Sequence, residues 1–214
     1  MRPLLLAMAA ACLAAACRSP SPPPSREDPA SPSSEPLIDI RDVDAGILVD
    51  IRYATDDNFT GKALYPAGRC LLRRSVAERL RSVRSDLAAV GLGLKVWDCY
   101  RPLAIQRELW ALVPDPRYVA DPEKGSRHNR GAAVDLTLVD AQGRELEMPT
   151  GYDDFTPKAH RDYAQGSPEA LRNRTALERA MSKRGFIGLR TEWWHFDAPG
   201  WRGYPLTDVP LERP

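Results

Sequence analysis

Two short segments of this 214-residue chain carry side chains of the types that hold metal ions. In the first, His128 lies in a glycine-containing loop, and Asp135 follows after six further residues on the polar face of an alternating segment. The second segment ends at His195. Two imidazoles and one carboxylate leave the fourth tetrahedral position open for water, which is typical of a catalytic rather than a structural zinc site. We therefore predict that His128, Asp135 and His195 hold one Zn²⁺ per chain.

Glu192 is the natural general base for such a site, because it is a carboxylate close to His195 in sequence that the metal does not need as a ligand. In a regular strand, however, positions 192 and 195 point to opposite faces of the sheet. The two side chains can share a site only if Glu192 belongs to a turn or bulge that enters the strand. We therefore predict a break in strand geometry near Trp193.

Each of these residues taken alone also fits a structural role. A single histidine on an alternating segment is more often a hydrogen-bonded structural residue than a ligand, and an aspartate on a strand is usually solvated or capping. The presence of both segments in one chain is what favours the metal site.

The elements that position these residues follow from hydrophobic spacing and capping residues. Ser75 and Glu78 form a capping-box pattern, and the apolar spacing that follows predicts a helix that ends at Gly91. Further helices are expected over 102–112 and 168–184, and strands over 94–100, 132–138 and 193–197. This order favours a single α+β domain, in which helices pack on a small mixed or antiparallel sheet and the zinc site lies at the sheet.

Composition narrows the class of partner. The formal charge is +1 and 43% of the residues are hydrophobic, as in an ordinary globular protein. Such a balance offers no basic surface for nucleic acid. A small or peptidic partner is the better expectation, and the oligomeric state stays open.

The N-terminal residues differ from the rest of the chain. Residues 1–16 combine one basic residue with a short apolar run and predict a secretory signal peptide. Residues 17–36 are dominated by Pro and Ser and predict a semi-extended tether, which leaves 37–214 as the folded domain. Small residues before Cys17 resemble a bacterial lipobox, so we expect a periplasmic protein attached through a lipid on Cys17. Ordinary cleavage after Ala16 is the alternative.

Only two cysteines remain in the predicted folded domain, Cys70 and Cys99. In an exported domain such a pair is a candidate disulfide. Two buried free thiols are the alternative. A thiol nucleophile is not expected, because no histidine is near either cysteine in sequence.

Four sequence patterns together resemble the D-alanyl-D-alanine dipeptidases, from about residue 36 to the C-terminus. These enzymes belong to the same zinc peptidase superfamily as the D,D-carboxypeptidases and the L-alanyl-D-glutamate endolysins, so the resemblance implies a hedgehog/DD-peptidase-like fold. Two of the patterns occur widely in the superfamily: Ser-x-His-x-x-Gly-x-Ala-x-Asp at 126–135 and Glu-x-Trp-His at 192–195. The others are Tyr-Arg-Pro at 100–102 and Tyr-Ala-Thr-x-x-Asn-Phe-Thr-Gly-Lys at 53–62, and the last points to the dipeptidases.

The resemblance implies roles for further residues. Arg101 would stabilise the oxyanion, and Tyr53 and Ser126 would contact the ends of the dipeptide. Asp153 would hold the substrate ammonium, by its match to a Met-Gly-x-x-Phe-Asp pattern. This chain departs from that pattern, because it reads Met-Pro-Thr-Gly-Tyr-Asp-Asp at 148–154 with a one-residue difference in spacing. Asp154 is therefore an alternative to Asp153.

The function expected from the residues and the resemblance is zinc-dependent hydrolysis of free D-Ala-D-Ala to two D-alanines. One rival is a D,D-carboxypeptidase or endopeptidase that acts on peptidoglycan stem peptides, which a lipid anchor and tether would suit. Another is a zinc-bearing peptidoglycan-binding module without catalysis, although such a module has no need of Glu192.

Overall fold

The computed structural model describes residues 35–212. The predicted signal peptide, Cys17 and nearly all of the predicted tether therefore lie outside the described residues. None of the helices among residues 35–212 is long and apolar enough to cross a membrane.

Two β-sheets make up the strands of the domain. A small antiparallel sheet pairs β1 (Leu37–Asp39) with β3 (Leu71–Arg73). The larger sheet has the order β2-β4-β5-β7-β6, formed by Leu48–Val49, Gly93–Asp98, Ala133–Val139, His195–Asp197 and Ile187–Gly188 respectively. Its β2–β4 pair is parallel and the other pairs are antiparallel, so the sheet is mixed.

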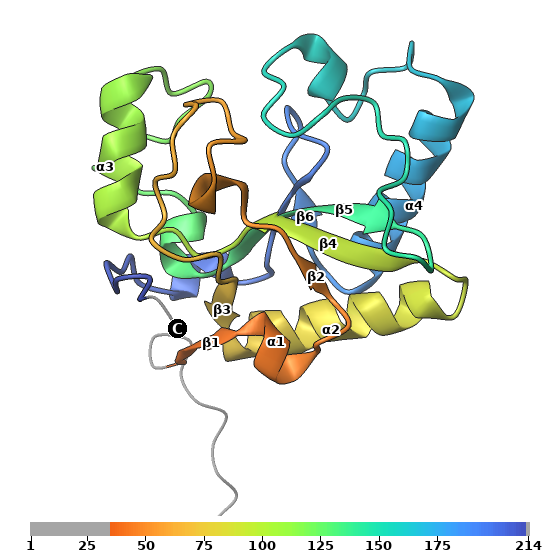
Figure 1. Ribbon diagram of the computed structural model, residues 1–214, viewed down its shortest axis with the longest axis horizontal. Coiled ribbons are helices and arrows are strands. Elements are labelled where there is room, and N and C mark those ends of the chain that lie inside the picture. Colours follow the sequence, from red (N-terminus) through yellow and green to blue (C-terminus); the bar gives the residue numbers. More distant parts are fainter. Residues whose placement is uncertain (1–34, 213–214) are drawn as a thin grey trace, which may run out of the picture. The chain divides into compact units, whose positions relative to one another are not determined.

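Four α-helices accompany the sheets: α1 (Ile40–Val43), α2 (Arg74–Ala88), α3 (Leu103–Leu112) and α4 (Pro168–Lys183). In Figure 1, α2 runs along one side of the large sheet, while the long connections drawn in orange and teal lie on the other side. The expected single α+β domain with a mixed sheet is confirmed, and the three helices expected from the sequence begin and end within three residues of their predicted limits.

Helix α2 buries an apolar stripe at helical spacing, formed by Val76, Ala77, Leu80, Val83 and Leu87. The predicted capping box at its start is wrong. Ser75 lies inside the helix, its backbone N–H donates to the carboxylate of Glu35, and its hydroxyl is paired with that of Tyr204. The residue before the helix, Arg73, is held in β3 and makes no side-chain cap.

Strand β5 is the centre of the large sheet, between β4 and β7, and all seven of its residues are buried. Its alternation places Val134, Leu136 and Leu138 on one face and Asp135 and Thr137 on the other. The polar face is thus covered as completely as the apolar one. A charged side chain on a buried face needs hydrogen-bond or ionic partners. Asp135 is such a residue.

Cys70 and Cys99 form a disulfide with a Cα–Cα distance of 5.1 Å. Cys70 directly precedes β3 and Cys99 directly follows β4. The bond therefore ties the small sheet to the end of a central strand of the large one.

Candidate metal centre and active site

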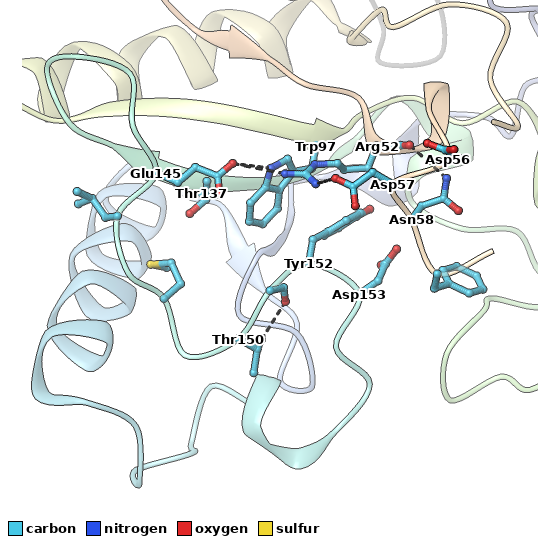
Figure 2. A pocket seen from close by; sticks show the side chains of 14 residues that line it. Arg52, Asp56, Asp57, Asn58, Trp97, Thr137, Glu145, Thr150, Tyr152 and Asp153 are labelled. Carbon is cyan, nitrogen blue, oxygen red and sulfur yellow. Dashed lines mark hydrogen bonds and ion pairs between the residues drawn. The ribbon is translucent and has the colours of Figure 1, made fainter. Parts of the chain in front are cut away.

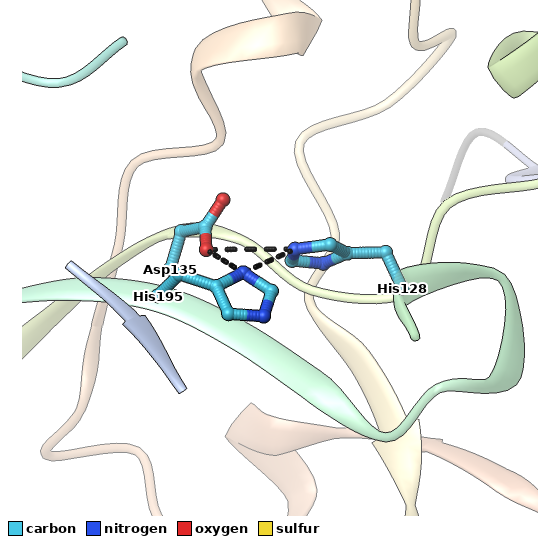
Figure 3. Close-up of side chains that lie close together, drawn as sticks. All are labelled: His128, Asp135 and His195. Atoms are coloured by element: carbon cyan, nitrogen blue, oxygen red, sulfur yellow. Dashed lines mark hydrogen bonds and ion pairs between the residues drawn. The ribbon is translucent and has the colours of Figure 1, made fainter. Parts of the chain in front are cut away.

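The side chains of His128, Asp135 and His195 lie close together and point toward one another (Figure 3). Nε2 of His128 lies 3.2 Å from Nδ1 of His195, and Oδ1 of Asp135 lies 2.9 Å from Nδ1 of His195 and 3.4 Å from Nε2 of His128. All three side chains are buried. Within residues 35–212 this is the one group of three or more His, Cys, Asp and Glu side chains that could hold a metal ion, and its ligand atoms lie within 4.8 Å of one another.

Strand pairing positions two of the three ligands. Asp135 on β5 lies directly opposite His195 on β7 in the antiparallel register, and residues in that relation project from the same face of a sheet. His128 comes from a 3₁₀ turn, His128–Arg130, that precedes β5. Gly131 ends this turn with a φ of 65°, and an added Cβ there would lie 2.3 Å from Leu37. A residue with a Cβ rarely adopts this left-handed conformation, so the turn that leads from His128 into β5 favours glycine at position 131.

Each imidazole uses its other nitrogen for a hydrogen bond to the protein. Nδ1–H of His128 donates to the carbonyl of Cys99 at 2.7 Å, because a carbonyl can only accept. Nε2–H of His195 donates to Asp197 at 2.9 Å. In the neutral imidazoles the two remaining ring nitrogens would carry the lone pairs, and both face Asp135. Fixing a tautomer from the far side in this way is the usual second layer of a histidine metal site.

The donor set fits zinc. Tetrahedral bonds of about 2.0–2.1 Å separate ligand atoms by about 3.3 Å, close to the three separations given above. The site also favours a positive charge. Burial opposes the charged form of His195, but hydrogen bonds with Asp135 and Asp197 outweigh it and raise the pKa of His195 to about 10. The negative charges of Asp135 and Asp197 that favour this proton would equally favour a metal cation, which competes with the proton for the nitrogen lone pair.

Glu192 lies beside the three ligands without joining them. Its Oε2 is 3.9 Å from Nδ1 of His195, and the side chain is 20% exposed. The predicted break in strand geometry is confirmed, because β7 begins only at His195 and Glu192 lies in a turn closed by its N–H to the carbonyl of Leu189. The expected strand start at Trp193 is correspondingly two residues too early. Burial, and then Asp135, raise the pKa of Glu192, which suits a group that must accept a proton near neutral pH.

A cavity of about 210 Å³ contains the metal ligands. Pockets for drug-sized ligands usually measure about 300–1,000 Å³, so this one suits a small molecule. Every non-cysteine site residue expected from the sequence lines it: Tyr53, Arg101, Ser126, His128, Asp135, Asp153, Glu192 and His195.

The guanidinium of Arg101 is held on three sides. It donates to Asp98 at 2.7 Å, to Gln106 at 3.0 Å and to the hydroxyl of Tyr65 at 3.2 Å. Burial opposes the charge, but Asp98 and the tyrosines outweigh it and raise the pKa of Arg101 well above its usual value. Arg101 is therefore a fixed cation in the cavity wall.

Asp153 and Asp154 lie in different surroundings. The carboxylate of Asp153 accepts from the hydroxyl of Tyr53 at 3.0 Å, while that of Asp154 accepts from the N–H of Thr156 in a turn. Asp153 also has a φ of 55°, the only positive φ of a non-glycine residue among the described ones. Such backbone costs energy and collects at functional sites. Burial, and then Asp135, raise the pKa of Asp153 well above its usual range, so this carboxyl lacks a full positive partner.

Among the residues that contact the expected site residues, the carboxylates Asp98 and Asp197 and the hydroxyl of Tyr152 were not predicted from the sequence. Asp197 could have been predicted from the sequence, because it follows His195 by two positions and therefore lies on the same face of the strand. Asp98 follows the apolar part of a strand, where a lone carboxylate is indistinguishable from a solvated one. Burial, and then Asp135, raise the pKa of Tyr152 well above its usual value.

Comparison with known proteins agrees with this site. The sequence model of the D-ala-D-ala dipeptidase family matches residues 33–209. The chain is 41% identical over 170 residues to the D-alanyl-D-alanine dipeptidase of Escherichia coli K12, which covers 79% of this chain and 88% of that protein. It is 35% identical to the Enterococcus faecalis enzyme of that name, over 71% of this chain and 85% of that protein. It is 34% identical to the Streptomyces coelicolor enzyme, over 71% of this chain and 86% of that protein. The chain belongs to the D-Ala-D-Ala dipeptidase family.

Proposed function

We propose that the protein is a zinc-dependent dipeptidase that hydrolyses free D-Ala-D-Ala to two D-alanines. The observation that carries the proposal is the content of one small cavity: three convergent metal ligands, the unliganded carboxylate of Glu192 and the buried carboxyl of Asp153. Three relatives that are 34–41% identical to the chain over the aligned residues are named D-alanyl-D-alanine dipeptidases.

The choice of zinc is supported by the donor set. Two imidazole nitrogens and one carboxylate oxygen with an open fourth position suit Zn²⁺ and not Mg²⁺ or Ca²⁺, which prefer oxygen ligands. A zinc ion here would acidify a water molecule and polarise the peptide carbonyl. His128, Asp135 and His195 would hold it, with the two histidines oriented by Cys99 and Asp197.

Asp153 and Tyr53 are the proposed receptors for the substrate ammonium. An ammonium that faced Asp153 would give this buried carboxyl the positive partner that it lacks, and would favour its charged form. Ser126, which lines the same cavity and accepts a hydrogen bond from the N–H of His128, is the proposed contact for the other end of the dipeptide. A free amino group is then a requirement for binding, and an N-blocked peptide would leave Asp153 without its partner.

Glu192 and Arg101 are the proposed catalytic residues. Glu192 takes the proton of the attacking water and delivers it to the leaving amine, and its position beside the ligands but off the metal supports this role. Arg101, fixed by Asp98 and Gln106, donates to the carbonyl oxygen as negative charge develops there. A preorganised donor of this kind contributes roughly 3–4 kcal/mol to transition-state stabilisation.

The proposal is tested with the purified protein by zinc analysis and by D-alanine release. We expect one zinc per chain, release of D-alanine from D-Ala-D-Ala, and little or none from N-acetyl-D-Ala-D-Ala or from a pentapeptide that ends in D-Ala-D-Ala. Equal cleavage of the pentapeptide would favour the D,D-carboxypeptidase instead. A protein that binds zinc but cleaves neither substrate would favour the binding module.

We also propose that the protein is exported and held at the membrane by a lipid on Cys17, with residues 17–36 as the tether. The composition of residues 1–36 supports this, as does the disulfide, because such bonds persist in oxidising compartments. Replacement of Cys17 by alanine should move the protein from the membrane fraction to the soluble fraction of the producing bacterium. Equal membrane association of both forms would contradict the lipid.

A further inference from the structure

Tyr152 contacts the carboxylate of Asp135 through the oxygen that the histidines do not contact. Its hydroxyl donates to Oδ2 of Asp135 at 2.9 Å. The other oxygen of the same carboxylate, Oδ1, is the one that faces the lone pairs of His128 and His195. The two oxygens of Asp135 are thus divided, one toward the metal position and one toward Tyr152.

This division limits how Asp135 can move. A carboxylate on a short side chain can rotate to present either oxygen or both, and the terminal torsion of Asp has only weak preferences of its own. A hydrogen bond to Oδ2 removes that freedom and leaves Oδ1 as the single ligand atom. Ligating carboxylates are commonly fixed in this manner, and their partners matter for metal affinity.

The ring of Tyr152 is itself held in place by aromatic neighbours. Its centroid lies 5.2 Å from that of Trp97, 5.6 Å from Trp194 and 6.2 Å from Tyr53. Trp97 and Trp194 are fully buried, so the ring rests on the core. Figure 2 shows Tyr152 alongside Trp97 and next to Asp153. The hydroxyl is therefore presented at a fixed position before any ligand binds, which is what a positioning group requires.

The backbone around Tyr152 also helps to direct its hydroxyl toward Asp135. In an extended chain, neighbouring side chains point to opposite sides. The left-handed conformation of Asp153 breaks this alternation, so that Tyr152 reaches Asp135 while Asp153 reaches Tyr53. The hydroxyl is also the group that distinguishes Tyr152 from the phenylalanine of the Met-Gly-x-x-Phe-Asp pattern.

We propose that Tyr152 is a positioning residue of the metal site, which fixes Asp135 through Oδ2 and thereby strengthens zinc binding. The inference rests on the proposed function insofar as it takes zinc to be the metal. It assigns a role to a residue that touches neither the metal nor the dipeptide in the proposed mechanism.

The test is the change Tyr152→Phe, which removes one oxygen atom and keeps the ring against Trp97. Zinc is removed from the holoenzyme by a chelator of known affinity, and the zinc dissociation constant is obtained from the competition. Loss of a partner to a metal ligand typically weakens binding about 10–100-fold, and we expect a change in this range. Tyr204→Phe is the matched control, because that hydroxyl is paired with Ser75 away from the site and its loss should leave zinc affinity unchanged.

The outcomes separate the inference from the proposed function. Equal zinc affinity of wild type and Tyr152→Phe would overturn the role of Tyr152 while leaving the dipeptidase intact. A higher KM for D-Ala-D-Ala with unchanged zinc affinity would also overturn it, because the hydroxyl would then act on the substrate. Failure of the wild-type protein to bind zinc would instead refute the proposed function.

Discussion

At the scale of single residues, the site depends on which nitrogen and oxygen atoms already have a hydrogen-bond partner in the protein. Both imidazoles give one nitrogen to a protein acceptor and keep the other for the cavity, and Asp135 divides its two oxygens in the same way. Glu192 has no hydrogen bond to another side chain among the described residues, and its nearest ionic contact is the 3.9 Å approach to His195. The ligands are therefore fixed, whereas the proposed base is free to exchange a proton.

The change Glu192→Gln tests the general base. Glutamine keeps the size of the side chain but cannot accept the proton, so kcat should fall about 10²–10⁴-fold. Zinc content should stay at the wild-type level, because Glu192 is not a ligand. Glu169→Gln, on the exposed first turn of α4, is the control and should leave kcat unchanged. Near-normal turnover in the Glu192 variant would exclude this role.

The pair Asp153→Asn and Asp154→Asn decides which aspartate holds the ammonium. Asparagine tolerates the left-handed backbone at position 153, so the fold is kept while the charge is lost. We expect KM for D-Ala-D-Ala to rise about 10–100-fold in the Asp153 variant, since hydrogen bonds to charged groups contribute about 1.5–3 kcal/mol. Kinetics of the Asp154 variant should match wild type, and a reversed result would assign the clamp to Asp154.

At the scale of elements, the long periodic segments were predictable and the short ones were not. Helix α4 shows why: Ser167 caps it through the N–H of Ala170, Pro168 occupies its first turn and Gly185 follows its end. Strands β1, β2, β3 and β6 contain only two or three residues, too few for an alternating pattern. Their pairing depends on contacts between distant segments. Trp193 and Trp194 looked like strand residues because they are apolar, yet they belong to the turn before β7.

The candidate site shows the same contrast between parts that the sequence predicts and parts that it does not. The cluster of His128, Asp135 and His195 with Glu192 beside it could be predicted, because these residue types and spacings are chemically restrictive. The groups that orient them, such as the carbonyl of Cys99 and the hydroxyl of Tyr152, come from segments 29 and 17 positions away in sequence. A backbone carbonyl leaves no trace in the residue types at all.

An ion pair between α2 and the end of α4 predicts a pH dependence of stability. Hydrogen bonds from Arg184 lower the pKa of Asp86 from 3.8 to about 2. Because the folded-state pKa is depressed, the stabilisation is fully present above about pH 4 and is lost as the pH falls through about 2. Asp86→Asn should lower the Tm slightly at neutral pH, and the difference from wild type should shrink between pH 4 and pH 2. The change Arg184→Gln should give the same pattern, and a constant difference across this range would contradict it.

At the scale of the whole domain, the disulfide connects stability to the metal site. Cys99 supplies both a sulfur to the bond with Cys70 and the carbonyl that orients His128. The bond also ties β3 to the end of β4, next to the segment that carries Arg101. One covalent link therefore holds the hydrogen-bond partner of His128 and the start of the segment that carries Arg101 against the rest of the fold.

The double change Cys70→Ser and Cys99→Ser tests this connection. For a sequence separation of 29, loss of the disulfide should lower the free energy of unfolding by about 3–4 kcal/mol. We expect a lower Tm in the metal-free protein and an equal or larger loss in the zinc-bound protein, because zinc stabilises the folded state of both forms and stabilises the variant less if its zinc affinity falls. Calorimetry with and without zinc measures both, and an unchanged Tm in the metal-free protein would contradict the prediction.

The register that places Asp135 opposite His195 has a consequence for divergence. Two ligands are set by strand pairing, whereas Tyr53 and Asp153 come from connections outside the strands of the sheet. Insertions, deletions and recombination can alter such connections without shifting a strand by one position. Natural variation and directed evolution can therefore change what this scaffold accepts while its hydrolytic chemistry is inherited unchanged.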